Sequence, residues 1–560
     1  MKLTRTVLCS LLLVAAACAG LADELPLKKL IQTGWDQVTP EQLREAVDLV
    51  EQQPFHGQVI RFAGRGDTPN FRLAFQREEW DMAAIALVIE DLQAAQAASA
   101  KPWERYLLVN ANPGDVDWFD DAGWESIVEH WRIAARVARE GGLTGILFDP
   151  EPYREPFRQF AWTAQPQYEQ HTFVEYHAKA RERGAAVMRA IVEEYPEITL
   201  FSYFMNSVNR MAAARPDPIR ALPGGTYDLF PGFIDGWLDV LPPTVTLVDG
   251  CESAYRFNSL VEYLSAYNRI KGDCQRLVSP ENRAKYRAQV QVGFGFYLDP
   301  YINPPDSTWY IDPQGMERVE RLGQNLRHAL EVTDEYVWVY GEKASWWPHP
   351  HPRAQERWWD ALPGIEDQIR AAGDPVAFAL GKLEEAGDDA PNLLSNGDFS
   401  AETAEAADVE QADDWVQEGA PPGWSAWQHP DSEGAFAWDR TVGHGAPGSV
   451  RMSGMSNGCV LQKAPVSPGE RYAVVGWRKI EGDGEATIRV RWQDPENRWH
   501  VPHLDVMIDA IGPGDQWVQM VGVVTVPEGA GFIVPLLSVH GQRGADDVTW
   551  YDDVTVLRLQ

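Results

Sequence analysis

Residues 145–153 read Gly-Ile-Leu-Phe-Asp-Pro-Glu-Pro-Tyr (GILFDPEPY), an unbroken apolar run that ends in two acidic residues. A run of this kind is typical of a parallel strand that is covered on both faces. Seven further apolar runs follow the same pattern, at residues 27–33, 58–62, 106–110, 199–204, 244–249, 289–296 and 336–340. Amphipathic helical stretches separate most of these runs. Eight strand–helix units in roughly 350 residues predict an α/β fold of the (β/α)8 TIM-barrel type, which fits better than an open doubly wound sheet.

The rhythm of the sequence changes after the predicted barrel, which we assign to residues 23–375. Residues 376–391 end in acidic residues and proline, and we interpret them as a linker. From residue 392 to 560, short runs with a period of two residues, such as Glu485–Trp492 (EATIRVRW), alternate with Gly, Pro and Asp turns. This pattern predicts a second, all-β domain with a jelly-roll sandwich fold.

The first 22 residues have the features of a signal peptide. Lys2 and Arg5 precede the apolar run Val7–Ala17, and small residues follow it. An alternative interpretation is a lipoprotein signal in which Cys18 becomes the lipid-anchored terminus. The sequence has no other apolar stretch long enough for a transmembrane helix. We therefore expect a secreted or periplasmic protein.

Composition restricts the class of partner. The chain has 49 Lys and Arg against 82 Asp and Glu, a formal net charge of −33. Nucleic acids and anionic membranes require clustered positive charge, so neither is expected as the main partner. The 23 tryptophans suit sugar binding, because flat rings stack on sugar faces. Strongly sulfated or uronate-rich polymers are mildly disfavoured, unless a local basic groove accepts them. The oligomeric state stays open.

The cysteines and the absence of zinc-binding motifs give little information about the function. Cys251 and Cys274 could pair in an oxidising compartment or could be two buried thiols, and the sequence does not decide between these alternatives. The sequence contains no CxxC pair and no HExxH motif, so a zinc site is unsupported.

Acidic residues follow several of the predicted strands, at the end of a barrel where active sites lie. Asp149 and Glu151 follow the fourth run, and Glu342 follows the eighth. Paired carboxyl groups carry out proton transfer and nucleophilic attack in glycosidases. We predict Glu151 as general acid/base and Glu342 as nucleophile. The predicted substrate contacts are Tyr153, Tyr203, Asn206, Asp249, Glu252, Tyr297, Trp346 and Trp347.

Three alternatives remain for these acidic residues. Asp149 could orient an N-acetyl group of the substrate, so that the sugar supplies the nucleophile. Asp249 or Glu252 could replace Glu342 if the strand count is shifted. The acids could also bind a metal, but no histidine accompanies them at the strand ends. We expect no cofactor in catalysis.

The C-terminal region carries a family resemblance. Asn392–Phe399 (NLLSNGDF), the Pro-Gly-Trp ending at Trp424, and Trp550–Val556 (WYDDVTV) are similar to carbohydrate-binding modules of the galactose-binding-like jelly roll, the family 4/9 type. The order of leader, barrel and β-sandwich resembles secreted bacterial glycoside hydrolases. The resemblance implies a sugar-binding face and often a structural calcium ion. The candidates for the face are Trp427, Trp438, Trp492 and Trp499, and those for calcium are Asp398 and Asp552.

These observations together predict a secreted glycoside hydrolase that acts on a polysaccharide or complex glycan and is targeted to it by the C-terminal module. The alternative is a non-catalytic glycan-binding surface protein with a degenerate barrel. An esterase or lyase on the same scaffold ranks lower, because the predicted barrel contains no GxSxG motif.

Overall fold

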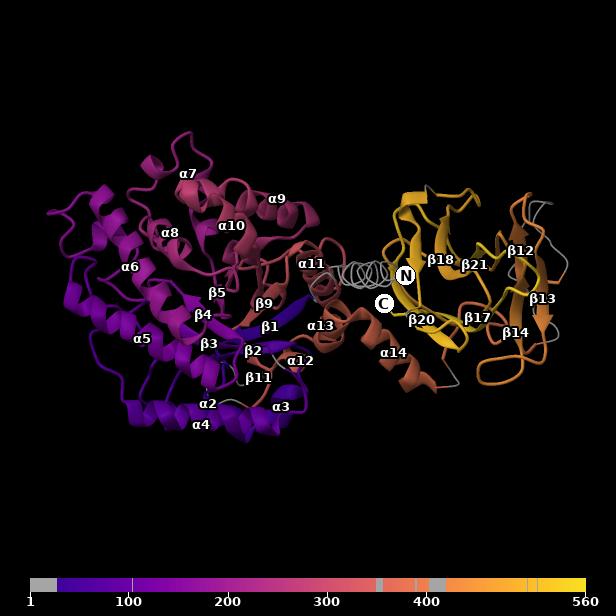
Figure 1. Ribbon diagram of the computed structural model, residues 1–560, viewed down its shortest axis with the longest axis horizontal. Coiled ribbons are helices and arrows are strands. Elements are labelled where there is room, and N and C mark those ends of the chain that lie inside the picture. Colours follow the sequence, from indigo (N-terminus) through magenta and orange to yellow (C-terminus); the bar gives the residue numbers. More distant parts are fainter. Residues whose placement is uncertain are drawn as a thin grey trace, which may run out of the picture. The chain divides into compact units, whose positions relative to one another are not determined.

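The computed structural model describes residues 28–102, 104–348, 356–387, 390–401, 419–500, 502–510 and 512–559. The predicted signal peptide, residues 1–22, and Cys18 lie outside these described residues. The chain divides into two compact units, Met1–Gly373 and Asp374–Gln560 (Figure 1). No helix formed by the described residues is long and apolar enough to cross a membrane.

The first unit is built on a nine-stranded parallel sheet with the strand order β7-β6-β5-β4-β3-β2-β1-β9-β8. Its strands are β1 (Lys29–Gly34), β2 (Gly57–Arg61), β3 (Glu104–Asn110), β4 (Gly145–Asp149), β5 (Thr199–Ser202), β6 (Thr246–Asp249), β7 (Val290–Val292), β8 (Phe294–Tyr297) and β9 (Tyr336–Gly341). The two ends of the order, β7 and β8, are separated in the chain by Gly293 alone. The sheet is therefore nearly closed and barrel-like, and one predicted strand, 289–296, is split in two.

Helices alternate with these strands and cover the sheet. They are α2 (Pro40–Glu45), α3 (Val47–Glu51), α4 (Met82–Ala98), α5 (Asp121–Glu140), α6 (Phe173–Glu194), α7 (Arg210–Ala213), α8 (Phe230–Val240), α9 (Leu260–Lys271), α10 (Arg283–Gln289), α11 (Arg318–Val332), α12 (Trp358–Ala361) and α13 (Ile365–Gly373). Capping residues fix several helix starts. The Thr172 hydroxyl accepts from the Glu175 amide at 3.4 Å, and the Glu175 carboxylate accepts from the Thr172 amide at 2.7 Å, which forms a capping box before α6.

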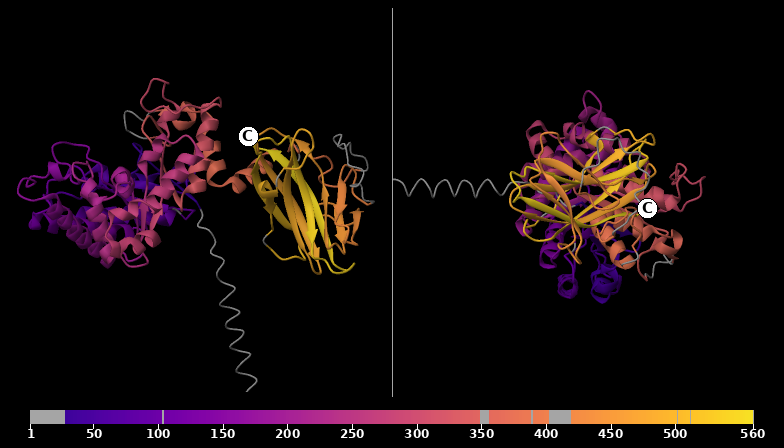
Figure 2. Two further views of the ribbon diagram at one scale, coloured as in Figure 1. Left: turned by 90° about the horizontal axis from the view of Figure 1, so that it is seen from above. Right: turned by 90° about the vertical axis from the view of Figure 1, so that its right-hand side faces the viewer.

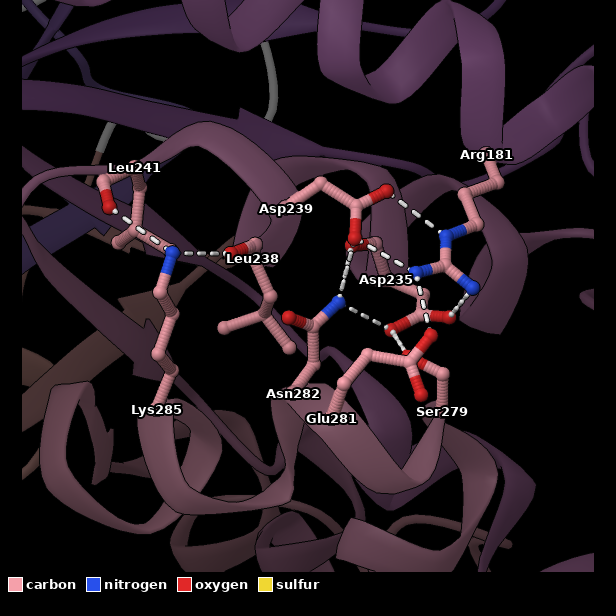
Figure 3. A network of polar contacts seen from close by, with 9 residues as sticks. All are labelled: Arg181, Asp235, Leu238, Asp239, Leu241, Ser279, Glu281, Asn282 and Lys285. Atoms are coloured by element: carbon pink, nitrogen blue, oxygen red, sulfur yellow. Dashed lines mark hydrogen bonds and ion pairs between the residues drawn. The ribbon is translucent and has the colours of Figure 1, made fainter.

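A polar network fastens α6 and α8 to the turn before α10 (Figure 3). Arg181 donates to Asp239 at 2.7 Å and forms an ion pair with Asp235 at 3.0 Å. Asn282 donates to both aspartates at 2.8 Å. Asp235 is buried, and its charge is compensated by these partners, as burial of a carboxylate requires.

The second unit contains two antiparallel sheets that enclose a separate apolar core (Figure 2). One sheet has the order β12 (Ser425–Gln428), β15 (Asn457–Leu461), β21 (Phe532–His540), β18 (Glu485–Gln493) and β19 (Val506–Ile508), with β16 (Ala464–Pro465) also paired to β21. The other has the order β13 (Ala435–Asp439), β14 (Ser449–Ser453), β22 (Val548–Arg558), β17 (Arg471–Glu481) and β20 (Val518–Thr525). The unit is thus an all-β sandwich.

The segment interpreted as a linker is mostly helical. Helix α14 (Pro375–Ala386) begins at Asp374, whose side chain accepts from the Ala377 amide at 2.9 Å. Ala379 of this helix packs with Ala473, Val475 and Leu557 of the β-sandwich. The helix therefore belongs to the second unit.

The three cysteines among the described residues, Cys251, Cys274 and Cys459, are buried free thiols. The disulfide considered for Cys251 and Cys274 is not formed, so the buried-thiol alternative holds.

Candidate active site at the strand ends

The site is centred on the carboxyl end of β4. Asp149 is buried, and its carboxylate accepts from Asn110 Nδ2 at 2.6 Å, from the Tyr153 hydroxyl at 2.7 Å and from the Glu151 amide at 3.0 Å. The same Tyr153 hydroxyl lies 2.7 Å from Glu151 Oε2. Asn110 ends β3, the neighbouring strand, and pairs in register with Asp149. Adjacent parallel strands thus place an amide and two carboxyl groups together.

A third carboxyl group joins this pair from β6. Burial, together with the negative charges of Glu151 and Asp149, raises the pKa of Glu252 to about 9. Burial and the charge of Glu151 raise the pKa of Asp149 to about 7, although Tyr153, the Glu151 amide and Arg72 oppose the shift. The pKa of Glu151 is also raised by burial. Asp149, Glu151 and Glu252, which we call the carboxyl trio, therefore all have raised pKa values and keep their protons to a higher pH than solvated carboxyl groups.

Aromatic side chains surround the carboxyl trio. Tyr203 stacks on Trp338 with ring centroids 4.3 Å apart, and its hydroxyl lies 3.0 Å from Thr33 Oγ1. Burial and the charges of the carboxyl trio raise the pKa values of Tyr203 and Tyr227. The ring centroids of Tyr255 and Tyr297 lie 4.9 Å apart. Burial and the charge of Glu252 raise the pKa of Tyr255. Rings close to shared carboxyl protons make a site suited to neutral, hydroxyl-rich ligands.

Glu342 lies in a different group of side chains. Its backbone amide donates to Asp299 at 3.1 Å, and its carboxyl group interacts with Tyr297. Tyr297 also approaches Asp299, at 3.3 Å. Tyr340 connects the two groups, because both Glu342 and Asp149 raise its pKa after burial. The charges that raise the pKa of Glu252 are those of Glu151 and Asp149. The charge of Glu342 instead raises the pKa values of Tyr297 and Tyr340.

Several predicted substrate contacts are buried by other residues. Asp249 is fully buried and accepts from the amides of Met205 at 3.0 Å and Ser207 at 2.9 Å, so it shapes the loop after β5. Asn206 is also fully buried. Neither side chain reaches the surface of the site.

The two tryptophans after β9 are also interior. Trp346 is 1% exposed, its amide donates to Asp36 at 2.8 Å, and its ring contacts Phe55 edge-on at 4.9 Å. Trp347 is 4% exposed. The strands β10 (Ala344–Ser345) and β11 (Glu356–Arg357) hold this segment, so stacking on a sugar ring is not available to either side chain.

Sequence reasoning missed Arg72, Tyr227 and Tyr255 as members of the site. Arg72 follows β2 in the chain, and its charge lowers the pKa of Asp149 against the effect of burial. Tyr227 precedes α8, far from any strand end. Long loops bring both side chains to the carboxyl trio, and no periodic pattern in the sequence marks such loops.

In the second unit, two of the four predicted sugar-binding tryptophans share a surface. Trp427 and Trp499 both pack against an outward apolar cluster of Cys459, Leu461, Val534 and Leu536. Arg491 lies over the Trp499 ring at 4.2 Å. This surface belongs to the sheet that contains β12, β15, β21 and β18.

The other two tryptophans lie elsewhere. Trp492 is 1% exposed within the core, and its indole donates to the Leu504 carbonyl at 2.9 Å. Successive residues of a strand face opposite sides, so Arg491 faces outward where Trp492 faces inward. Trp438 lies on β13 of the opposite sheet and donates to the Phe399 carbonyl at 2.7 Å.

The two calcium candidates are close enough to interact. Burial and the charges of Asp553 and Asp398 raise the pKa of Asp552 to about 7. Calcium takes about 6–8 oxygen ligands. Among the described residues, no group of three or more His, Cys, Asp or Glu side chains is arranged to hold a metal. The structural calcium ion implied by the family resemblance stays a prediction, with Asp398 and Asp552 as its candidate ligands.

No protein-family model matches this chain, and no curated protein matches it. Among solved structures, the chain is similar to the CBM22-1 xylan-binding domain of Paenibacillus barcinonensis Xyn10C, at 14% identity and a TM-score of 0.22, over 30% of this chain and 96% of that one. It is similar to TmCBM61, solved with β-1,4-galactotriose, at 16% identity and a TM-score of 0.19, over 30% of this chain and 99% of that one.

A third similar structure is the enzymatically active domain of tailspike protein 4 of bacteriophage CBA120. The identity is 16% and the TM-score 0.21, over 30% of this chain and 21% of that one. TM-scores of this size are too low to carry an argument, so the function rests on the residues of the site.

Proposed function

We propose that this protein is a secreted or periplasmic glycoside hydrolase that cleaves a polysaccharide or complex glycan. The barrel-like unit, taken as a (β/α)8 barrel, carries the active site, and the second unit, taken as a jelly-roll carbohydrate-binding module, retains the polymer. The observation that supports this proposal is the carboxyl trio after β4 and β6, in which Glu151 raises the pKa of Asp149, and both raise that of Glu252, among aromatic rings.

Glycoside hydrolysis needs one protonated and one ionised carboxyl group. Glu151 and Glu252 meet this need as a coupled pair, because a proton on Glu151 removes the negative charge that opposes ionisation of Glu252. In the proposed mechanism, the proton that the pair shares passes from Glu252 to Glu151 and from there to the leaving oxygen. Glu252, ionised by this transfer, provides the carboxylate that attacks the anomeric carbon or activates water. Glu252 thus takes the role predicted from sequence for Glu342.

Asp149 has a supporting role in this scheme. Three donors, Asn110, Tyr153 and the Glu151 amide, hold its buried carboxyl group in place. Asp149 orients Tyr153 and, through its charge, contributes to the raised pKa of Glu252. Tyr227, which is partly exposed, provides a ring surface and a hydroxyl group that contact sugar, and the buried Tyr203 supports the site from beneath.

The decisive experiment measures reducing-end release from a panel of plant, algal and host polysaccharides. Glu151→Gln and Glu252→Gln are each expected to reduce turnover by about 10²–10⁴-fold, the usual contribution of acid–base catalysis. Glu342→Gln is the matched control, and we expect it to keep turnover within about tenfold of the wild type.

Other outcomes would redirect the proposal. If Glu342→Gln alone abolished release, Glu342 would be the second carboxylate. If Glu252→Gln and Glu342→Gln both retained release from N-acetylated glycans only, the variant in which Asp149 orients an N-acetyl group would replace the two-carboxylate scheme. No release by the wild type from any polymer, with binding intact, would favour the non-catalytic glycan-binding protein.

A further inference from the structure

A cavity of about 540 Å³ adjoins the carboxyl trio, and Glu252 forms part of its lining. The loops after β5 and β6, helix α9 and Trp309 supply the other walls. The volume lies within the range of about 300–1,000 Å³ that is typical of small-molecule sites. A ligand bound at Glu252 can therefore extend into this cavity.

Three arginines line the cavity, in a chain whose net charge is −33. Arg256 lies over the Trp309 ring at 3.9 Å and donates to the Thr308 carbonyl at 3.1 Å. Arg210 and Arg269 are both exposed, and neither forms an ion pair or a side-chain hydrogen bond with any residue that the structure describes. Two guanidinium groups thus remain available to a ligand.

In the part of the chain that the structure describes, neither acidic residue of the lining, Glu252 or Glu262, forms an ion pair with these three arginines. Glu262 Oε2 is occupied by the Asn258 amide and the Ser259 hydroxyl, both at 2.8 Å. Glu252 shares a proton with Glu151 because burial and the neighbouring acids raise its pKa, so the pair carries less than two negative charges. The cavity therefore carries local positive charge directly beside the proposed catalytic pair.

A guanidinium group binds a carboxylate or a sulfate through paired hydrogen bonds, which a neutral hydroxyl cannot match. We propose that this cavity is a subsite for a sugar that carries a negatively charged group, a uronate carboxylate or a sulfate ester, with Arg210 and Arg269 as its ligands. This inference rests on the proposed function, because it places the charged sugar next to the bond that is cleaved. Exposed Trp309 offers a ring edge to the same sugar.

Binding to the full-length Glu151→Gln protein tests the subsite without turnover. Isothermal titration compares oligogalacturonate, glucuronoxylan oligosaccharides and carrageenan oligosaccharides with their carboxyl-reduced or desulfated counterparts. We expect at least one acidic oligosaccharide to bind about tenfold or more tightly than its neutral counterpart at low salt, the effect of a charged hydrogen bond. Preference for the uronates or for the sulfated oligosaccharides identifies which acidic group is bound.

Adding Arg210→Gln and Arg269→Gln to this protein should reduce that preference to below about twofold. Arg220→Gln is the matched control, because Arg220 is exposed in the same region of the chain but does not line the cavity. Equal binding of every acidic and neutral pair would overturn the subsite, and so would a preference that survives the double substitution.

The two proposals can fail separately. If the wild type released no sugar but the protein still bound acidic oligosaccharides more tightly through the two arginines, the subsite would be supported and the hydrolase proposal contradicted. If the wild type released sugar from neutral polymers alone and bound acidic oligosaccharides no more tightly than neutral ones, the hydrolase would be supported and the subsite contradicted.

Discussion

Glu252 illustrates how single residues set the charge of the site. It lies close enough to Glu151 and Asp149 for their charges to act on it, and its folded-state pKa of about 9 lies well above its ordinary value of 4.5. The native state therefore keeps a proton that the unfolded chain releases between these pH values. Its contribution to stability is complete below about pH 4.5 and is lost as the pH rises through about 9.

This linkage predicts that the free energy of unfolding of the barrel-like unit falls between pH 5 and pH 9. Glu252→Gln carries no titrating proton, so its slope should be flatter by up to about 1.4 kcal/mol per pH unit. Calorimetry at several pH values measures the difference, with the exposed Glu331→Gln as control. Parallel slopes for Glu252→Gln and the wild type would show that Glu252 does not hold the proton.

Sequence reasoning found part of this site. The two-residue spacing of Asp149 and Glu151 was sufficient to place both at one strand end, because strand geometry is regular. Strand spacing could not decide whether Glu342 or Glu252 is the second carboxyl group of the site, because both follow their strands in loops. The loop after β9 turns so that the Glu342 amide bonds to Asp299, and such a path depends on contacts between distant segments.

Close helix packing is the main feature at the scale of elements. In α8, Gly236 lies against α6 so closely that an added Cβ would meet the Arg181 carbonyl oxygen at 2.0 Å. In α14, by contrast, an added Cβ at Gly381 has no described heavy atom within 4 Å. The two glycines separate the effect of packing from that of helix propensity.

We expect Gly236→Ala to lower the free energy of unfolding by about 1–3 kcal/mol through overpacking. Gly381→Ala should raise it by roughly 0.5–1 kcal/mol, because alanine favours a helix. Thermal unfolding of both full-length variants measures these changes. A stabilising Gly236→Ala would mean that the two helices can move apart without cost.

The regular elements were predicted well, and their irregularities were not. The predicted apolar runs correspond to β1–β9, since hydrophobic pattern alone specifies buried parallel strands. Helix α14 was taken for a linker, because its short apolar side faces a sheet that the sequence does not reveal. Trp492 was taken for a ligand contact, although its alternation with Arg491 already indicated an inward side chain.

At the scale of the whole molecule, the proposed division into a catalytic unit and a polymer-binding unit makes a separate prediction. Trp427 and Trp499 share an outward surface of the β-sandwich, far in sequence from the carboxyl trio. The double variant Trp427→Ala/Trp499→Ala should reduce retention on insoluble polysaccharide by about tenfold or more, the usual effect of removing aromatic contacts. Its turnover of soluble oligosaccharides should match the wild type.

Pull-down with insoluble polymer and turnover of soluble fragments measure the two effects. Trp438→Ala, on the opposite sheet, is the control. Equal loss on soluble and insoluble substrates would indicate that the tryptophans support folding and do not retain the polymer.

The pairing of β1 with β9 affects how the chain folds while it is being synthesised. The sheet order runs from β7 through β1 and β9 to β8, so β1 gains its second neighbour only through Tyr336–Gly341. Until the ribosome has added those residues, the newborn chain has an open strand edge near its start, a surface prone to mispairing. A polypeptide that stalls before residue 336 therefore has no ring to close, however complete its earlier strands are. The sheet of the barrel-like unit can therefore be completed only after the chain has been synthesised past Gly341.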